Sequence, residues 1–485
     1  MVMAMNGECT TAGSRPPLYE QVAERLVNLI EQGTFRAGDR VPSIRILSRQ
    51  LDVSVNTVMQ AYAVLEDRRV LEARPQSGYY VCSRLPEIAD CPLVARQVIA
   101  PAPVTVSGLC QQVLQNMMNS DLIPLGGVVP NPALLPTERL NRMLASESRR
   151  FPVQSISYMM TPGSERLRTQ IARRALLAGC SVRPDDVVIT SGCVEAVALA
   201  LRAVCRQGDN IAIESPLYFN FLQLIRELGL NALEIPTTSR EGMSVEALRY
   251  AIEHNPVKAC LIIANFGNPL GSLMPDGKKK ELVELLARHD IPLIEDDVYG
   301  DLCFANTRPT AVKAYDRQGM VIYCSSFSKT VAPGYRVGWT IAGRFQPEIE
   351  RLKMLINVAT PAPTQLAMAE FLANGGYDHH LRSIRKSYAR QVALMAESVG
   401  RYFPSGTKVT RPAGSSILWV EMPERIDAIT LYHQAFASGI SIAPGPLFSI
   451  SDRFHNYIRL NASFWSPEVE GAIRTLGSLA AGQGG

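Results

Sequence analysis

The chain has 485 residues, of which 47% are hydrophobic and 19% charged, and its 49 Lys and Arg against 45 Asp and Glu leave a formal net charge of +4. This length predicts about three folding units and excludes a small disulfide-stapled module, while the composition excludes a disordered chain. The small net charge argues for neither nucleic acid nor an anionic membrane as a partner, so a motif must support either one.

Ten cysteines are scattered along the chain, without a C-x-x-C pair or a histidine at zinc-finger spacing. We therefore expect no metal site, and we expect the cysteines to be small buried side chains in a reducing cytosol. The first residues, MVMAMNGECTTAGS, lack a basic segment followed by an apolar one, and no run approaches the roughly 18 apolar residues that a membrane-spanning helix needs. The sequence predicts a cytoplasmic protein without a membrane partner.

Residues 15–83 form an Arg-rich segment without lysine that predicts three helices. Apolar residues recur every fourth position over residues 18–30 and precede Gly33, which is typical of an amphipathic helix with a glycine stop. Ser43 and Ser54 are each expected to cap a further short helix. The expected buried faces of these two helices are Ile44, Leu47 and Leu51, then Val58, Tyr62 and Leu65. Two short helices joined by a tight turn predict a helix-turn-helix.

A β-hairpin is expected after these helices, because apolar residues at 70–71 and 79–81 flank a turn at residues 74–78. A three-helix protein-docking module is the alternative. The charge of residues 15–83 allows it, since nine Arg against eight Asp and Glu leave a net charge of only +1. The order of the motifs favours DNA binding instead.

Three motifs carry a resemblance to a known DNA-binding family. GDRVPSIR at residues 38–45, VSVNTV at 53–58 and GYYV at 78–81 resemble the winged helix-turn-helix of the GntR family along the whole segment. The resemblance implies that the helix beginning near Ser54 enters the major groove of double-stranded promoter or operator DNA. The DNA-binding residues that it implies are Arg40, Ser43, Arg45, Arg49, Ser54, Asn56, Thr57, Gln60 and Gln76.

Within this set, the arginines are expected near phosphates and groove edges, whereas Asn56, Thr57 and Gln60 are expected at the bases. The hairpin wing is expected to touch the minor groove. The sequence departs from the family pattern at Val55, where the family often has Arg after the capping Ser. An expected guanidinium contact is therefore missing, and the family pattern does not predict the DNA sequence that is preferred.

Residues 84–116 contain four prolines and predict a linker. Beyond them, short apolar runs alternate with helical patterns over residues 117–485. The runs lie at residues 187–190, 211–213, 261–264, 291–294 and 321–323. Continuous apolar strands separated by helices indicate an α/β fold with a mostly parallel sheet covered on both faces.

The most specific stretch of the chain runs from Ser326 to Gly338, directly after the predicted strand at 321–323. Lys329 stands between this strand and a Pro-Gly turn, and Arg336 follows seven residues later. An aldehyde cofactor that carries a phosphate needs an amine to form an imine, and it needs cationic and hydroxyl donors for the phosphate oxygens. Ser326, Lys329 and Arg336 supply these groups.

A turn of small residues, Ser191-Gly192-Cys193-Val194, joins the predicted strand at 187–190 to a helical pattern. Such a turn directs free backbone N–H groups and the positive end of a helix at an anion, which suits a phosphate. Many turns of this kind serve only packing, so the turn alone is weak evidence.

Asp296 and Tyr299 follow the predicted strand at 291–294, at the edge where α/β sheets present ligand groups. A carboxylate beside a pyridine nitrogen keeps that nitrogen protonated, because an opposite charge favours the charged form. Asp297 is an alternative by one residue, although its spacing to Tyr299 differs from D-x-x-Y.

These motifs resemble the class I aminotransferases, the fold-type I pyridoxal phosphate enzymes, over roughly residues 120–480. The resemblance implies that Lys329 is the catalytic residue that forms the imine with pyridoxal 5'-phosphate. Ser326 and Arg336 match the family's phosphate-binding residues, as does the turn at 191–194. The resemblance also implies a smaller C-terminal α/β subdomain.

Four residues match the family's contacts with the cofactor ring. Tyr218 matches an aromatic residue that stacks on the pyridine, and Asp296 matches the residue that holds the ring nitrogen. Asn268 and Tyr299 match the residues that bind the phenolic oxygen. Without the resemblance, Tyr218 is equally explained as a core aromatic residue and Asn268 as part of an Asn-Pro turn.

Four further residues match substrate or partner contacts in the family. Arg459 matches the Arg that clamps a substrate's α-carboxylate, a task that suits the planar guanidinium, although it is also explained as a surface residue on a strand. Gly126 and Gly127 match small residues that line the substrate pocket. Tyr158 matches a Tyr that reaches the phosphate of the partner subunit, which implies a homodimer.

A GntR-type winged helix followed by an aminotransferase-like body resembles the MocR subfamily of bacterial transcription regulators over nearly the whole chain. The resemblance implies a DNA-binding regulator whose body binds pyridoxal phosphate, and an amino acid or amine, as effector. One alternative is a catalytically active aminotransferase that carries a DNA-binding domain. Another is a DNA-binding protein with an inactive body, which the complete set of Lys329, Asp296 and Arg336 disfavours. Regulation is preferred because an enzyme alone does not need the first 83 residues.

Overall fold

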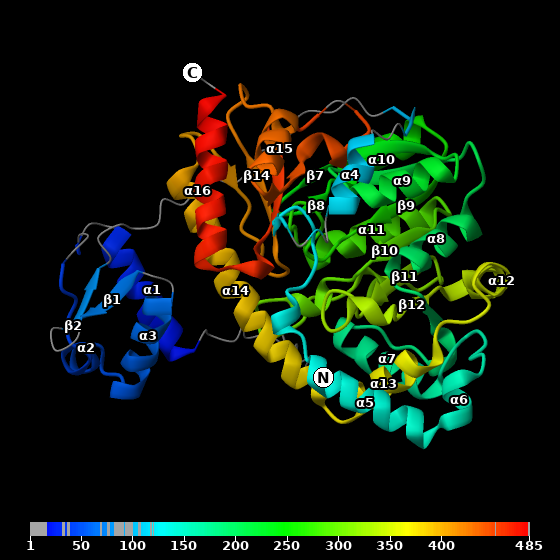
Figure 1. Ribbon diagram of the computed structural model, residues 1–485, viewed down its shortest axis with the longest axis horizontal. Helices are drawn as coiled ribbons and strands as arrows, with labels where there is room; N and C mark the ends of the chain where they lie inside the picture. Colours follow the sequence, from blue (N-terminus) through cyan, green and yellow to red (C-terminus); the bar gives the residue numbers. More distant parts are fainter. Residues whose placement is uncertain are drawn as a thin grey trace, which may run out of the picture. The chain divides into compact units, whose positions relative to one another are not determined.

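The computed structural model describes residues 17–31, 34–35, 39–67, 70–74, 78–81, 92, 100–104, 108–116, 119, 121–451 and 453–483. The chain divides into two compact units, Met1–Glu87 and Ile88–Gly485 (Figure 1). Among the described residues, no helix is long and apolar enough to span a membrane.

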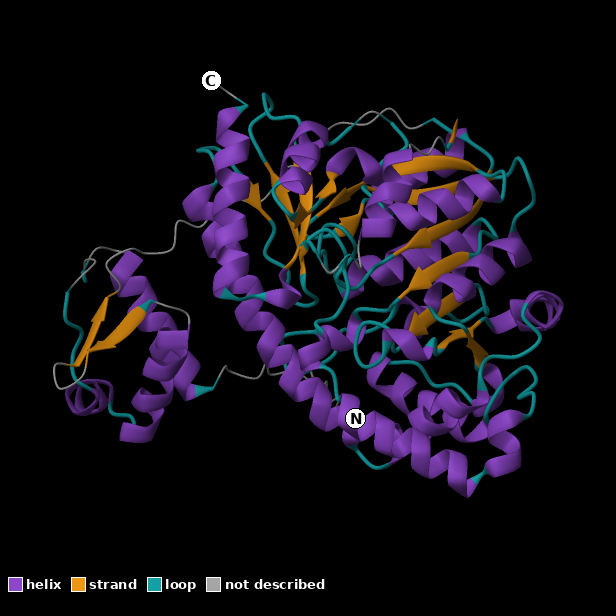
Figure 2. Cartoon of the chain, viewed as in Figure 1, coloured by secondary structure: helices purple, strands orange, loops and turns teal. Residues whose placement is uncertain are grey.

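The first unit contains α1 (Leu18–Glu31), α2 (Ile44–Leu51) and α3 (Val55–Asp67), followed by the antiparallel strands β1 (Leu71–Arg74) and β2 (Gly78–Val81) (Figure 2). The core of this unit is formed by Val22, Ala23, Leu26, Ile30, Val41, Leu47, Val58, Ala61, Tyr62, Leu65, Leu71 and Val81. The helix-turn-helix and the wing are therefore both present, as the sequence predicts.

Serine caps begin the second and third helices of this unit. The Ser43 hydroxyl accepts the N–H of Ile46 at 3.4 Å, and the Ser54 hydroxyl accepts the N–H of Thr57 at 3.0 Å. Asp52 has a left-handed φ of 52° and ends α2, so the chain turns within the three residues that precede α3. This short turn fixes how α3 leaves α2.

The large unit begins earlier than the sequence predicts. β3 (Ala102–Pro103) pairs with a strand of the large sheet, and α4 (Gly108–Asn116) buries Cys110 and Val113 in the core of the C-terminal subdomain. The expected linker at 84–116 is therefore shorter, because residues 102–103 and 108–116 belong to the large unit. Prolines are accepted in β3 because an edge strand does not need every backbone N–H.

The large sheet has the order β3-β7-β6-β9-β10-β11-β12-β5, with β8 (Gly242–Met243) beside β7. Its parallel strands are β7 (Asn231–Thr238), β6 (Asn210–Ser215), β9 (Val257–Ile262), β10 (Leu293–Asp296) and β11 (Val321–Ser326). β12 (Gly338–Ile341) is antiparallel to both β11 and β5 (Val188–Thr190). The sheet is therefore mostly parallel, as predicted.

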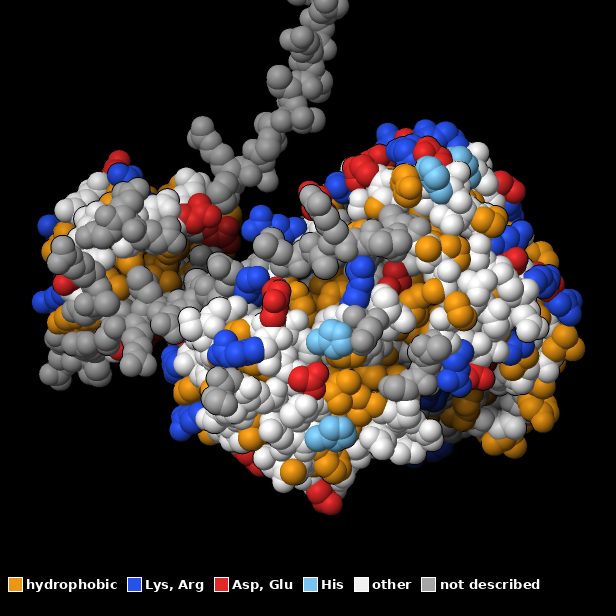
Figure 3. Space-filling model, turned by 90° about the horizontal axis from the view of Figure 1, so that it is seen from above, with side chains coloured by type: hydrophobic (Ala, Val, Ile, Leu, Met, Phe, Trp, Pro, Cys, Tyr) orange, Lys and Arg blue, Asp and Glu red, His pale blue; other side chains and the backbone are white. Residues whose placement is uncertain are grey.

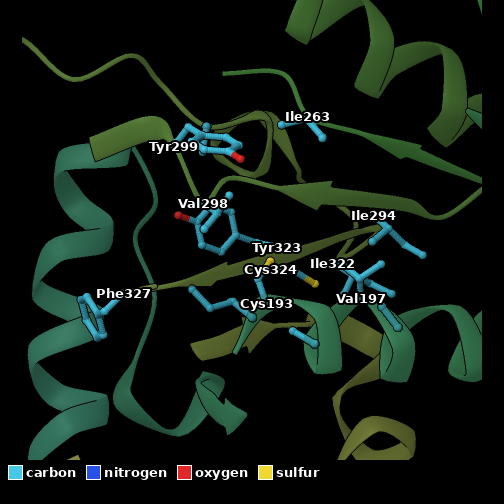
Figure 4. Close-up of a cluster of buried hydrophobic side chains, with 14 of the residues drawn as sticks. Cys193, Val197, Ile263, Ile294, Val298, Tyr299, Ile322, Tyr323, Cys324 and Phe327 are labelled. Carbon is cyan, nitrogen blue, oxygen red and sulfur yellow. The ribbon is translucent and has the colours of Figure 1, made fainter. Parts of the chain in front are cut away.

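Both faces of this sheet are covered. Leu261 and Ile263 belong to one apolar cluster, whereas Cys260 and Ile262 belong to another, because successive strand residues point to opposite faces. α8 (Cys193–Val204) lies on the first face, where Val197 packs near strands β10 and β11 (Figure 4). The opposite face is covered by α10 (Val245–His254) and α11 (Asp276–Arg288). The remaining helices of this part are α5 (Thr137–Arg150), α6 (Pro152–Ile156), α7 (Glu165–Ala175), α9 (Phe219–Glu227), α12 (Gln346–Ile356) and α13 (Ala362–Ala373).

A smaller C-terminal subdomain is built on an antiparallel sheet of order β13-β14-β17-β16. Its strands are β13 (Lys408–Val409), β14 (Ile417–Glu421), β17 (Tyr457–Asn461) and β16 (Ala443–Pro444), and its helices are α14 (Gly376–Tyr402), α15 (Ala428–Ala437) and α16 (Pro467–Gly482). A two-stranded parallel sheet joins β15 (Ile440–Ser441) to β4 (Ile123–Pro124). This pairing brings the segment after residue 124 against β17.

The cysteines follow the prediction as far as the structure describes them. Cys110, Cys180, Cys193, Cys205, Cys260, Cys303 and Cys324 are free and buried. Cys9, Cys82 and Cys91 lie outside the described residues.

Candidate cofactor and DNA sites

The turn before α8 and the Arg336 loop form one anion-binding cradle. Gly192 has a φ of 94°, and a Cβ there would overlap the guanidinium of Arg336. Arg336 donates from Nη2 to the carbonyl of Ser191 at 2.8 Å and from Nη1 to the Ser328 hydroxyl at 3.3 Å. Only glycine allows the arginine to lie against the N-terminal end of α8, where backbone N–H groups are available to an anion.

Three residues that the sequence analysis missed hold this turn in place. Glu195 accepts the N–H of Ser191 at 2.5 Å and forms an ion pair with Lys353 at 3.3 Å. Asn357 donates to the Ser191 hydroxyl at 2.9 Å, and it also donates to Glu195. Because the Ser191 oxygen accepts this bond, its own proton remains available for a phosphate oxygen. Glu195 could have been found from the sequence, because an acidic residue in the first turn of a helix is a recognisable signal. Lys353 and Asn357 lie about 160 residues away, and no sequence signal connects them with the turn.

Lys329 lies in the loop after β11, half-buried, and its Nζ donates to the carbonyl of Val128 at 2.6 Å. Burial lowers the pKa of Lys329 to about 8; Arg459 and Arg336 add to this effect and Asp296 opposes it. A lowered pKa increases the fraction of neutral amine, which is the form that attacks an aldehyde. Ser326 is close by in the chain, and its hydroxyl accepts the N–H of Ser328 at 3.3 Å.

The structure separates Asp296 from Asp297. Asp296 is buried, and one oxygen, Oδ1, accepts the thiol of Cys193 and the N–H of Val298, both at 3.1 Å. Burial raises the pKa of Asp296 to about 6. Figure 4 shows Cys193, the first residue of α8, near Cys324 of β11. Asp296 therefore lies beside both the turn before α8 and Lys329.

Asp297 follows β10 directly and is bonded to a different set of buried side chains. It forms an ion pair with Arg308 and accepts hydrogen bonds from Tyr323 at 2.9 Å and Asn265 at 2.9 Å. Both carboxylate oxygens of Asp297 already accept hydrogen bonds within this buried network. This geometry favours Asp296 over the alternative that the sequence left open.

Arg459 is 1% exposed and lies in the same site. It donates from Nη1 to the side-chain oxygen of Asn268 at 3.1 Å and from Nη2 to the carbonyl of Gly126, while its Nε has no partner. The rings of Phe219 and Phe448 lie 5.5 and 5.1 Å from its guanidinium carbon. Among the described residues, no carboxylate pairs with this buried cation.

Tyr299 and Tyr218, which were predicted to contact the cofactor ring, lie near Arg459 and Asp296. Burial raises the pKa of Tyr299, with a further contribution from Asp296, and Asn268 forms a side-chain hydrogen bond with Tyr299. Burial also raises the pKa of Tyr218, on which Arg459 and Asp296 act in opposite directions. Both tyrosines therefore lie close enough to Arg459 and Asp296 to be affected by their charges.

Gly126 and Gly127 line the Arg459 side of the site. The carbonyl of Gly127 accepts the Asn461 amide at 2.7 Å, and a Cβ on Gly126 would lie 2.8 Å from the backbone of Ile442. Tyr158, in contrast, is 81% exposed, so within one chain it does not join the other site residues. Val194 is also partly exposed, at 38%.

The predicted DNA-binding residues lie on the surface of the first unit. Arg40, Ser43, Arg45, Arg49, Ser54, Asn56 and Gln60 are exposed and Thr57 is half-buried, whereas Gln76 lies outside the described residues. Arg40 pairs with Tyr80 of the wing through a backbone bridge. On the face of the large unit seen in Figure 3, the described basic and acidic side chains are interspersed.

Cofactor affinity is expected to depend on pH through Asp296. Its pKa of about 6 means that the carboxylate is neutralised as the pH falls below 6, so its attraction for a protonated ring nitrogen is lost there. We expect the affinity for pyridoxal phosphate, measured by absorbance titration between pH 5 and 7.5, to fall steeply below pH 6. The Asp296→Asn variant should bind more weakly at pH 7.5 and show a flatter profile. An identical slope in both proteins would contradict this role of Asp296.

Comparisons with known proteins agree with this geometry. The family "Aminotransferase class I and II" matches residues 153–476, and "Bacterial regulatory proteins, gntR family" matches residues 18–81. The HTH-type transcriptional regulator YjiR of Escherichia coli (strain K12) is 38% identical over 449 residues, which cover 92% of this chain and 94% of that protein. Aromatic-amino-acid aminotransferase 1 of Thermococcus litoralis is 30% identical over 361 residues, or 73% of this chain and 86% of that protein.

A solved structure resembles the large unit. The α-aminoadipate aminotransferase LysN of Thermus thermophilus, in complex with N-(5'-phosphopyridoxyl)-L-leucine, matches with a TM-score of 0.72 and 26% identity, covering 78% of this chain and 95% of that one. The aminotransferase domain implies pyridoxal phosphate as the cofactor. The anion cradle at Gly192, the amine of Lys329 and the buried carboxylate of Asp296 fit its phosphate, aldehyde and ring nitrogen.

Proposed function

Because the chain belongs to the aminotransferase class I and II family and carries a gntR-family regulatory domain, the MocR-type architecture, we propose that pyridoxal phosphate and an amino acid or amine act as effectors of its DNA binding. The observation that carries this proposal is the presence in one chain of a folded winged helix-turn-helix and of an amine, an arginine and a glycine turn suited to pyridoxal phosphate. The DNA contacts are those of the exposed residues on α2 and α3. The proposed location is the cytoplasm, where the DNA of a bacterium lies, since the gntR family consists of bacterial regulatory proteins.

Within the large unit, each side chain has its own task. Arg336, Ser326 and the turn before α8 bind the phosphate, Asp296 holds the ring nitrogen, and Lys329 forms the covalent bond. When bound, pyridoxal phosphate would supply an electron sink that stabilises negative charge at the α-carbon of an amino acid. Arg459 positions the α-carboxylate of an incoming amino acid. An effector changes DNA binding only if it favours one arrangement of the two DNA-binding units over another.

DNA footprinting tests this function directly. We expect the full-length protein to protect two half-sites near its own gene, and we expect amino acids to change the affinity or the footprint only when pyridoxal phosphate is present. The Lys329→Ala variant should keep its DNA affinity and lose this response. No specific footprint on genomic DNA, together with transamination at ordinary aminotransferase rates, would contradict the proposal.

An active aminotransferase is the second candidate, and the complete set of Lys329, Asp296 and Arg459 favours it. This function predicts rapid amino-group transfer from some amino acid to a keto acid. Deletion of residues 1–83 would leave that rate unchanged, whereas a regulator would lose all specific DNA binding on the same deletion.

The protein is also proposed to form a homodimer, and a group of exposed apolar side chains supports this. The group comprises Val153, Ile156, Tyr158, Met160, Met354, Leu355, Ile356 and Val358. A bridge between Met160 and Ala359 joins its two segments, so these residues form one surface near the turn before α8. Monomeric proteins rarely expose so many neighbouring apolar side chains. Tyr158 lies within this surface, as a residue that reaches the partner's cofactor must.

Ile156→Asp is expected to weaken the homodimer at least tenfold, because Ile156 is 87% exposed in one chain and its replacement would bury an unpaired carboxylate at the interface. Sedimentation velocity over a range of concentrations measures the effect. Tyr250→Asp is the control, since Tyr250 is 53% exposed on α10, across the sheet. Equal dimer stability in both variants would place the interface elsewhere.

A further inference from the structure

The first two turns of α3 expose one continuous face. Val55, Asn56, Met59 and Gln60 are exposed at successive positions of this face, while Val58 is buried behind it. Val55 and Met59 are 48% and 50% exposed, although both are apolar. Thr57 is half-buried beside this face, and its hydroxyl is hydrogen-bonded to Ser54 at 2.8 Å.

The chemistry of this face is selective for one type of base pair. α3 has the sequence VNTVMQAYAVLED, so it contains no Arg or Lys. Arg and Lys make the commonest specific contact with guanine, through O6 and N7, whereas Asn and Gln pair with N6 and N7 of adenine and apolar side chains contact the methyl group of thymine. Two amides and two apolar side chains therefore match adenine and thymine, and the helix has no cation for guanine.

We propose that α3 recognises A·T base pairs, with Val55 and Met59 against thymine methyl groups and Asn56 and Gln60 at adenine edges. This rests on the proposed function, because it names the DNA that the same surface binds. Arg45 and Arg49 are exposed on α2, and the proposal assigns them to the flanking phosphates. Val55 and Met59 lose their contact with water when the helix enters the groove. Burial of this apolar surface favours binding, and it is largest where thymine methyl groups lie against the two side chains.

Selection and methyl removal test the proposal on the unmodified protein. The full-length protein is used to enrich duplexes from a random-sequence DNA library, and the affinity of the enriched duplex is then measured by fluorescence anisotropy. We expect half-sites with A·T pairs at the positions under α3. Replacing each thymine there by deoxyuridine removes only a methyl group and should weaken binding about fourfold per methyl group, the effect of one buried apolar carbon.

Two variants assign the effect to residues. Val55→Ser should reduce the penalty for deoxyuridine, because its side chain no longer contacts the methyl group. Ala63→Ser is the control, since Ala63 is exposed on the next turn of α3, and it should keep the full penalty. Val55→Arg should shift the selected half-sites toward guanine.

The outcomes separate this inference from the proposed function. Enrichment of no duplex at all contradicts DNA binding itself. Enriched half-sites with G·C pairs under α3, or an affinity that is unchanged by deoxyuridine, contradict only the recognition of A·T pairs. A penalty that is equal in wild type and Val55→Ser would overturn the role of Val55.

Discussion

After saturation with pyridoxal phosphate and reduction with borohydride, the cofactor is expected on Lys329 alone, and Lys329→Ala is expected to lose the covalent label completely. Lys329 is the amine that lies in the site, with its pKa lowered to about 8 by burial, so it is partly neutral at physiological pH. Its loop is anchored through the carbonyl of Val128, and Asp296 contributes the nearby negative charge. Mass spectrometry of digested protein measures the label.

Two observations control this experiment. Lys280→Ala should label like the wild type, because Lys280 is exposed on α11 and forms only a surface ion pair with Glu284. Lys329→Ala should keep a cooperative thermal transition, since the lysine contributes little to the apolar core. Finding the cofactor on another lysine of the wild-type protein would refute the assignment.

Arg459→Ala is expected to abolish the response to amino acids while leaving the cofactor in place. The guanidinium is buried without a carboxylate partner among the described residues, and its Nε is free to donate. Burial lowers the pKa of Arg459 only to about 10, so the side chain stays charged at neutral pH and a substrate carboxylate would neutralise it. Removing one partner of such a pair costs about 2–5 kcal/mol, which corresponds to at least a thirtyfold weaker response.

The measurement is the shift in the cofactor's visible absorbance when individual amino acids are added. Each amino acid is compared with the amine that lacks its carboxylate, which tests the role of Arg459 in the intact protein as well. The wild type should respond more strongly to the amino acid, whereas Arg459→Ala should treat both alike. A wild type that responds equally to both ligands would show that Arg459 does not read the carboxylate.

The local signals in the sequence were sufficient for many elements. The Ser43 and Ser54 caps, the three helices and the wing all depend on residues within a few positions of one another, and the structure has them where they were predicted. The mostly parallel sheet also follows from its continuous apolar strands. The linker prediction was wrong at residues 102–103 and 108–116, which form β3 and α4, and prolines typical of a linker are also accepted in an edge strand such as β3.

The candidate cofactor site could likewise be predicted from the sequence only in part. The types and spacing of residues around Lys329, Asp296 and Gly192 were visible in the chain, because a strand followed by a turn places them at one edge of the sheet. The sequence did not show which of the two aspartates lies beside Lys329. That choice depends on hydrogen bonds from Arg308, Tyr323 and Asn265 to the Asp297 carboxylate, and these residues are distant in the chain.

By itself, the sequence determined the residue types of the candidate sites and the local elements that carry them, because caps, turns and strand ends are properties of neighbouring residues. Only the tertiary structure decided the partners of these residues. Glu195, Lys353 and Asn357 meet at the phosphate turn, and Arg459 lies buried beside Asn268, although far apart in the chain. Such contacts arise when distant segments pack together, and packing depends on the shape and volume of the whole core rather than on spacing along the chain.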